Sequence, residues 1–360
     1  MKLTLNASQL QNLVTKAIKG SSNNKLLPMT SLMSIDYDGK GKLALTTTDI
    51  TNYLTVAIND ASNSSEELHL VVMAENFAKL VSKMTSENIN LEYEDNTFTV
   101  SGGRSNYKIE LPLDVDGSLI KLVSPEVSGK VGKTVKLTSI KNILTTAKSS
   151  LATTLNEPCY TAYYIGESVL STDTYKICCI KEKLLDKPVL ISSDTMDLLD
   201  LAEADLKCTM SGDSIKFETD DGLYSLSTKT YDGIESYSVD AISQLVESEF
   251  KSYCVLNKND MLQALDRLAL FVGSYDRNVI NISFDAEQLV MTNKAQAGTE
   301  IVDYASEDKG VEFNCSIDIE LLMSQIKAAP NDEIKLYYGL DNCIKIADDS
   351  TIQIISLFSE

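Results

Sequence analysis

Apolar residues recur with a helical spacing in three stretches that begin about 120 to 130 residues apart, which is one domain length. The stretches are residues 6–20, 137–150 and 257–271. In the first, Leu10, Leu13 and Val14 fall on one face of a helix. A Ser, Thr or Asn near the start of each stretch is suited to cap the helix. The sequence therefore predicts a helix near the start of three similar units.

A strand, a short polar turn and a second strand follow each of these helices. The pattern is an apolar triplet, a Thr-rich bend, about four polar residues and a second apolar alternation. It covers residues 43–58, 171–184 and 289–304. A second helical stretch comes next, at residues 73–88, 192–205 and 315–329, before alternating strands joined by tight turns.

These repeats predict an α+β fold of three domains, each with two helices packed on antiparallel sheets. The expected domains are residues 1–124, 125–246 and 247–360, with links near 116–127 and 240–250. A protein built from three similar units more often forms an extended or closed assembly than a single active site.

Composition indicates a globular protein without a membrane segment. The chain is 43% hydrophobic and 23% charged, and no stretch approaches the roughly 18 apolar residues of a membrane span. The N-terminus lacks the apolar core of a signal peptide, so we expect a cytoplasmic protein. A net charge of −20 repels nucleic acid as a whole. Any role that faces DNA therefore requires a local basic surface.

The sequence offers little for catalysis. The single histidine, His69, lies between alternating apolar residues, as is typical of a strand, and the common motifs of hydrolases, phosphate loops, dinucleotide sites and zinc proteases are missing. The seven cysteines form no CxxC pair, and the neighbours Cys178 and Cys179 would point to opposite faces of a strand. We therefore expect free thiols in the core, no metal and no cofactor.

Five stretches, in this order along the chain, resemble those of the bacterial-type β sliding clamp, the processivity factor of DNA polymerase III. They are residues 27–50, 101–112, 170–180, 231–237 and 313–322. The resemblance covers the whole chain and does not distinguish a cellular from a phage-encoded clamp. It implies a protein without catalysis that encircles duplex DNA and tethers the replicative polymerase and other clients after a clamp loader has placed it there.

The resemblance also implies a head-to-tail homodimeric ring of six domains whose twelve helices line a central hole. Twelve helices about 10 Å wide place their axes on a circle about 120 Å in circumference. The free hole is then about 28 Å in diameter, which admits a duplex with a layer of water. Lysines on these helices would touch phosphate through few, exchangeable contacts. The DNA-facing candidates are Lys16, Lys19, Lys25, Lys79, Lys83, Lys141, Lys148, Arg267, Arg277 and Lys327.

One helix departs from this pattern, because residues 192–205 carry five acidic residues and no basic one. We therefore expect the net attraction between the ring and DNA to be weak.

Members of the resembled family bind short apolar client peptides in a cleft between their second and third domains. The resemblance places there Leu155, Thr172, Thr174, Tyr175, Lys176, Ile177, Val239, Ile354, Leu357 and Phe358. The family has a glycine–histidine pair where this chain has Thr174–Tyr175, so its peptide preference is expected to differ. The mode would be a peptide with a few apolar anchors in a groove.

Two other classes of function stay open from the residues alone. A structural or adhesive repeat protein that binds only protein would suit the acidic composition, whereas paired lysines such as Lys79 and Lys83 suit a clamp. An enzyme has no positive support in the sequence.

Overall fold

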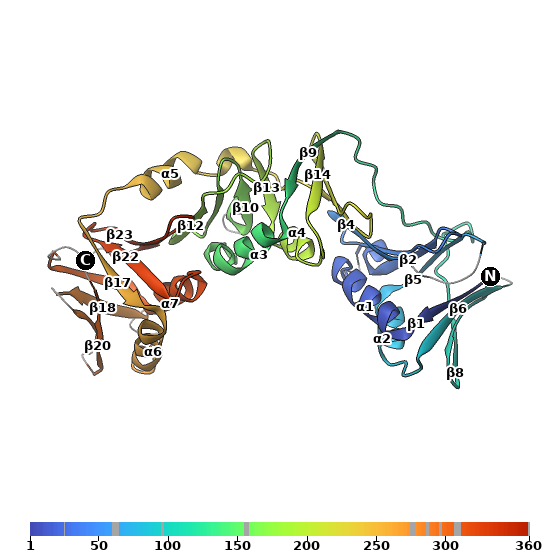
Figure 1. Ribbon diagram of the computed structural model, residues 1–360, viewed down its shortest axis with the longest axis horizontal. Coiled ribbons are helices and arrows are strands. Elements are labelled where there is room, and N and C mark those ends of the chain that lie inside the picture. The colour runs from blue at the N-terminus through green and yellow to red at the C-terminus, as the bar shows by residue number, and fades with distance from the viewer. Residues whose placement is uncertain are drawn as a thin grey trace. The chain divides into compact units, whose positions relative to one another are not determined.

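The computed structural model describes residues 1–24, 26–59, 65–94, 97–154, 158–273, 278–285, 288–294, 297–305 and 311–358. One order of elements occurs three times within it: strand, helix, four strands, helix, three strands (Figure 1). This recurrence confirms the prediction of a repeated α+β unit, while the residue boundaries of the domains stay a prediction.

The first copy comprises β1 (Lys2–Asn6), α1 (Ala7–Ala17), β2 (Leu32–Tyr37), β3 (Leu43–Thr48), β4 (Asn52–Ile58), β5 (Leu68–Met73), α2 (Ala74–Ser82), β6 (Asn88–Glu94), β7 (Thr97–Gly102) and β8 (Ser105–Ile109). The second comprises β9 (Lys130–Val135), α3 (Leu137–Thr146), β10 (Ala162–Ile165), β11 (Val169–Thr172), β12 (Lys176–Ile180), β13 (Val189–Ser192), α4 (Ser193–Leu199), β14 (Leu206–Ser211), β15 (Ser214–Glu218) and β16 (Tyr224–Lys229).

The third copy comprises β17 (Ser252–Asn257), α6 (Lys258–Ala269), β18 (Val279–Phe284), β19 (Gln288–Asn293), β20 (Thr299–Asp303), β21 (Phe313–Asp318), α7 (Ile319–Ala328), β22 (Glu333–Tyr338), β23 (Cys343–Ala347) and β24 (Thr351–Ser356). An additional helix, α5 (Val239–Glu247), precedes it.

Two eight-stranded sheets are each shared by neighbouring copies. One has the order β5-β2-β3-β4-β16-β15-β14-β9 and the other the order β13-β10-β11-β12-β24-β23-β22-β17. Leu54 of β4 lies opposite Leu226 of β16, and Ile177 of β12 lies opposite Ile354 of β24. The strands of the middle copy are thus divided between two sheets.

Because of this division, the chain forms two compact units that cut across the middle copy. They are Met1–Leu137 with Asp194–Thr230, and Thr138–Ser193 with Tyr231–Glu360. Each unit also contains a four-stranded sheet, β1-β6-β7-β8 in the first and β20-β19-β18-β21 in the second. In the first unit α1 packs against α2, and in the second α6 packs against α7 (Figure 1).

The same hydrogen bond ties a strand to the end of the first helix in each copy. In each copy a buried polar side chain from the strand donates to a backbone carbonyl at the C-terminal end of that helix, where the regular helical hydrogen bonds end. The bonds run from Thr47 to Ala17, from Ser171 to Ala147 and from Asn293 to Phe271, at 2.6, 2.7 and 2.8 Å. The helix and the strand-turn-strand are therefore positioned together.

The predicted helices at residues 6–20, 137–150 and 257–271 are confirmed. Asn6 caps α1 by accepting from the backbone N–H groups of Ser8 and Gln9, and Asn257 caps α6 in the same way. The second helix of each copy is shorter than predicted. In the third copy the residues from Cys315 to Asp318 belong to β21, because they pair with β18, and Asp318 then caps α7.

The predicted link at residues 240–250 contains most of helix α5, an element that was not predicted there. A helical spacing of apolar residues was present there, at Val239, Ile242 and Val246. This amphipathic pattern was the sequence signal from which helix α5 could have been predicted.

The single histidine lies on a strand, as predicted, and most of the cysteines lie in the core, as predicted. His69 lies on β5 and its Nδ1 contacts the carboxylate of Asp36. All seven cysteines are free, and six of them are buried. No helix in the described part of the chain combines the length and the apolar composition that a membrane span requires.

We expect Ser171→Ala to lower the free energy of unfolding by about 1 kcal/mol, because it removes the shorter of the two hydrogen bonds that the Ala147 carbonyl accepts, the other coming from the Ser150 N–H at 3.1 Å. Urea denaturation followed by circular dichroism measures this. Ser236→Ala, at an exposed position, serves as the control and should change stability by less than about 0.5 kcal/mol. Equal effects of the two substitutions would contradict the role given to Ser171.

Candidate functional site

The floor of the predicted cleft lies where β12 and β24 pair. Ile177 and Ile354 face each other across the two strands and are 8% and 3% exposed. Ile355 lies opposite Lys176, and the backbone N–H of Ser356 donates to the carbonyl of Tyr175 at 2.9 Å. Residues from the second and third copies, far apart in sequence, therefore share one surface within the second unit.

A tight turn between β11 and β12 forms one side of this surface. The hydroxyl of Thr172 donates to the carbonyl of Lys176 at 2.7 Å and accepts from the N–H of Thr174 at 3.0 Å. The carboxylate of Asp173 accepts from the N–H of Lys176 at 2.7 Å. Thr172 is thus a structural residue of the turn, with 3% of its surface exposed.

The first copy repeats this turn almost atom for atom. There the hydroxyl of Thr48 donates to the carbonyl of Asn52 and accepts from the N–H of Ile50, while Asp49 accepts from the N–H of Asn52. Ile50 and Thr174 occupy the same place and have φ angles of 86° and 77°. A β-branched residue is strained in this left-handed region, which suits glycine.

Lys176 is held inside the turn. Its Nζ donates to the carbonyl of Ser149 at 2.6 Å and lies 3.3 Å from a carboxylate oxygen of Asp173. The side chain is 11% exposed. Its charge is therefore engaged by neighbouring residues, and its alkyl stem supplies most of what it presents to a ligand.

Two large side chains remain accessible beside the floor. Tyr175 is 63% exposed and Phe358 is 40% exposed. The backbone N–H groups of Leu357 and Phe358 donate to the carbonyls of Asn342 and Ser316, both at 2.9 Å. Tyr175 and Phe358 form an apolar rim, whereas the half-buried Leu357, also predicted for the cleft, packs on the core on the other face of the sheet.

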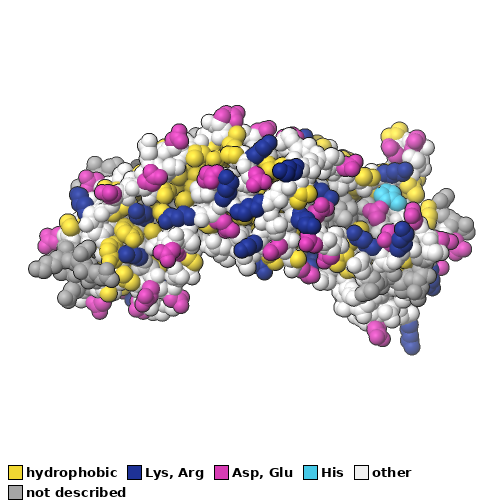
Figure 2. Space-filling view, turned by 45° about the horizontal axis from the view of Figure 1, so that its top comes forward, with side chains coloured by type: hydrophobic (Ala, Val, Ile, Leu, Met, Phe, Trp, Pro, Cys, Tyr) yellow, Lys and Arg dark blue, Asp and Glu magenta, His cyan; other side chains and the backbone are white. Residues whose placement is uncertain are grey.

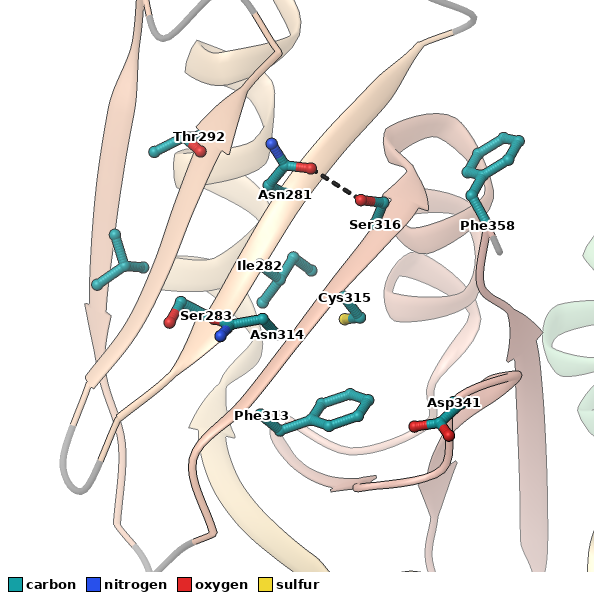
Figure 3. A pocket seen from close by; sticks show the side chains of 11 residues that line it. Asn281, Ile282, Ser283, Thr292, Phe313, Asn314, Cys315, Ser316, Asp341 and Phe358 are labelled. Atoms are coloured by element: carbon teal, nitrogen blue, oxygen red, sulfur yellow. Dashed lines mark hydrogen bonds between the residues drawn. The ribbon is translucent and has the colours of Figure 1, made fainter. Parts of the chain in front are cut away.

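Phe358 also borders a groove of about 630 Å³ on the outer sheet of the third copy (Figure 3). The polar residues along the groove come from β18, β19 and β21, and Ser316 Oγ donates to Asn281 Oδ1 at 2.8 Å across two of these strands. Asp341 and Phe313 lie at its other end. This groove could not be predicted from the sequence, because it depends on how Phe358 lies against β21.

Val239 begins helix α5, and this helix covers the floor. Ile242 is buried, and Val239, Leu245 and Val246 pack on the same apolar cluster as Ile177 and Ile354. Leu155, also predicted for the cleft, lies outside the described residues, as do Lys25 and Arg277 of the predicted DNA-facing set.

Some of the predicted DNA-facing cations of the first unit have acidic partners. Lys16 forms an ion pair with Glu203, and Lys79 forms one with Glu75 on the same helix. Lys19 borders a hollow that it shares with acidic side chains from β3–β4 and α4, namely Asp49, Asp194 and Asp197. Lys83, at the end of α2, is exposed. The local positive field is correspondingly reduced.

In the second unit the predicted cations are mostly exposed. Lys141, Lys148 and Lys327 lie at the surface. Arg267 instead makes a two-point contact with Glu300 of β20, at 2.9 and 2.6 Å. The hydrogen-bonded guanidinium holds the pKa of the Glu300 carboxyl below its ordinary value. Figure 2 shows basic and acidic side chains interspersed on the face that it presents.

Within the described part of the chain, no group of three or more His, Cys, Asp or Glu side chains is arranged to hold a metal ion. Burial raises the pKa of the Cys178 thiol above its ordinary value and that of Cys315 to about 12. Both therefore stay protonated at neutral pH, where a thiol is a weak nucleophile and a poor metal ligand.

Solved structures of bacterial sliding clamps match the whole chain. The DNA polymerase sliding clamp of Bacillus subtilis is 18% identical with a TM-score of 0.86, covering 100% of this chain and 99% of that chain. The beta subunit from DNA polymerase of Streptococcus pyogenes is 16% identical with a TM-score of 0.88, covering 100% of both. The DNA polymerase III beta subunit of Thermotoga maritima is 15% identical with a TM-score of 0.83, covering 100% and 99%.

Neither a family model nor a curated protein matches the sequence. The structural matches over the whole chain nevertheless show that it has the sliding-clamp fold, which confirms the predicted fold class.

We expect Thr174→Gly to raise the free energy of unfolding by about 0.5 to 1 kcal/mol, because relief of the left-handed strain exceeds the entropy that glycine loses. Urea denaturation measures it. The matched control is Thr145→Gly on the exposed face of α3, where the same replacement should be destabilising. A loss of stability at both positions would show that Thr174 is unstrained.

Proposed function

We propose that this protein is a DNA sliding clamp that acts in the cytoplasm. Two chains form a ring that encircles duplex DNA without reading its sequence and tethers a replicative DNA polymerase and other clients. A clamp loader places the ring on DNA, and the protein itself performs no catalysis. The observation that carries the proposal is the match of the sliding-clamp fold over the whole chain, with TM-scores of 0.83 to 0.88.

The distribution of charge suits a protein that slides. Exposed lysines such as Lys83 and Lys141 offer long, exchangeable contacts to phosphate, while ion pairs such as Lys16–Glu203 limit their number. A few such contacts give a weak, salt-sensitive attraction. Retention on DNA would then come from closure of the ring.

Two open sheet edges support closure into a head-to-tail dimer. In the sheet orders of the described residues, β8 and β20 are edge strands, and edge strands readily pair with another chain. Lys108 lies on β8 and Arg104 directly before it, whereas β20 carries the acidic Asp303 beside Glu300, whose charge is already paired with Arg267. Opposite charge favours pairing of β8 of one chain with β20 of the next.

Apolar side chains near these edges would form the centre of the contact. Tyr107 on β8 is 47% exposed, and Leu270 and Phe271 after α6 are 81% and 57% exposed. Ile301 on β20 is 56% exposed. Large exposed apolar residues that gather at an edge are typical of a protein interface.

We propose that client peptides dock on the rim and the floor of the β12–β24 surface. Tyr175 and Phe358 would offer accessible apolar contacts, and the Ile177–Ile354 pair would receive a buried anchor. The proposed clients are the polymerase, the loader and other proteins with short apolar motifs.

The wild-type chain should be a dimer of twice its 39.5 kDa mass by light scattering at micromolar concentration. Leu270→Asp combined with Phe271→Asp should yield a folded monomer, because burying the new charges in the interface is unfavourable. Val115→Asp, at a fully exposed position, is the control and should remain dimeric. A monomeric wild type would contradict ring closure and favour a repeat protein that binds only protein.

On circular primed DNA, with the polymerase and loader of the same source, the wild-type chain should lengthen the products severalfold. Tyr175→Ala should weaken this stimulation about fivefold at limiting clamp, because loss of an interface tyrosine costs about 1 kcal/mol. The matched truncation Val115→Ala should leave it unchanged. Failure of the wild type to lengthen products would overturn the proposed function.

A further inference from the structure

Helix α5 occupies the surface on which clients are proposed to dock. Its apolar side consists of Val239, Ile242, Leu245 and Val246, and Ile242 is 4% exposed. These side chains pack on the cluster that contains Ile177 and Ile354. The floor, formed by Ile177 and Ile354, is therefore apolar, and α5 covers it and excludes solvent.

The surface beneath α5 continues as a row of side chains across five strands. Register places Ile354 between Ile177 and Lys345, and Tyr337 between Lys345 and Tyr253. Side chains directly opposite one another in neighbouring strands share a face. The row thus begins apolar under α5 and becomes aromatic and basic toward β17. The other face of this sheet belongs to the core beneath α6 and α7, so α5 can leave without opening that core.

Helix α5 has little stability of its own, and its flanks hold it on this surface: Tyr237 before it packs on Tyr160 and Tyr164, and Phe250 after it packs on Tyr337. The helix has nine residues, fewer than an isolated helix needs for stability in water. Its N-cap residue, Ser238, makes no side-chain capping bond, and its hydroxyl accepts from the Tyr160 hydroxyl at 3.0 Å. At the other end, Lys345 Nζ donates to the carbonyl of Ser248 at 3.2 Å. A lysine at this place also complements the negative end of the helix dipole.

We propose that α5 is a built-in competitor for the client cleft, so that a client peptide must displace α5 before it reaches the Ile177–Ile354 floor. That the surface covered by α5 is a cleft for clients rests on the proposed function. The rim formed by Tyr175 and Phe358 stays accessible while α5 is docked, and a client would contact it first. Displacement leaves Lys345 without the Ser248 carbonyl, so a client with an acidic residue after its apolar anchors fits best.

The probe is a fluorescein-labelled peptide with the sequence of residues 238–250, which carries the α5 anchors. The full-length double variant Ile242→Asp with Leu245→Asp keeps the floor and disables the attached helix. We expect this variant to bind the peptide at least about tenfold more tightly than the wild type, because the apparent affinity scales with the fraction of open floor. Fluorescence anisotropy measures both.

Two controls separate competition from general loosening. Gln244→Asp places the same acid on the exposed side of α5 and should leave peptide binding at the wild-type level. A peptide with both anchors replaced by Asp should bind neither protein. Equally weak binding of the native peptide by wild type and a folded double variant would overturn the proposal.

Hydrogen exchange of the wild type keeps the proposal testable if the double variant does not fold. The N–H of Ile242, bonded to Ser238, should exchange at least about tenfold faster than the N–H groups that pair β24 with β12. Equal protection would show that α5 opens only with the sheet, which would refute its role as a competitor.

Both measurements are made without DNA, loader or polymerase. A failure here therefore leaves the proposed clamp function standing, and a failure to lengthen replication products leaves the competition between α5 and the peptide intact.

Discussion

Backbone hydrogen bonding between strands of neighbouring copies is the constraint on which this structure depends. A sheet edge with unpaired N–H and C=O groups is unstable unless something covers it, and β4 meets β16 while β12 meets β24. The pairing fuses strands of neighbouring copies into one continuous sheet within each compact unit. It also places residues of two copies side by side, which creates the surface proposed for clients.

The turn before β12 shows how one local motif serves both architecture and site. Thr172 and Asp173 saturate their hydrogen bonds within the turn, and Ser171 ties the strand to the end of α3. Because these polar groups are already satisfied, the turn exposes mainly Tyr175 to a ligand. Cys178 and Cys179, which follow, continue the strand behind it.

The charge balance of −20 and a role around DNA are compatible because the cations are distributed and partly paired. Lys16, Lys79 and Arg267 each face a carboxylate, so in the proposed ring only the remaining exposed lysines would offer weak and exchangeable contacts to phosphate. A ring that moves along DNA requires retention by topology more than by affinity. The same reasoning explains why an acidic helix, α4, is tolerated among the helices.

The sequence by itself determined the repeated order of elements, the capped helices that begin at Ala7 and Lys258, and the strand-turn-strand before Cys178. Each of these follows from periodicity and local hydrogen bonding, which a short stretch encodes completely. Only the tertiary structure decided which strands pair between copies, that Lys16 meets Glu203, and that α5 lies on the Ile177–Ile354 floor. An amphipathic pattern indicates that one face of an element is buried. It does not indicate which element covers that face, because this depends on contacts between residues far apart in the chain.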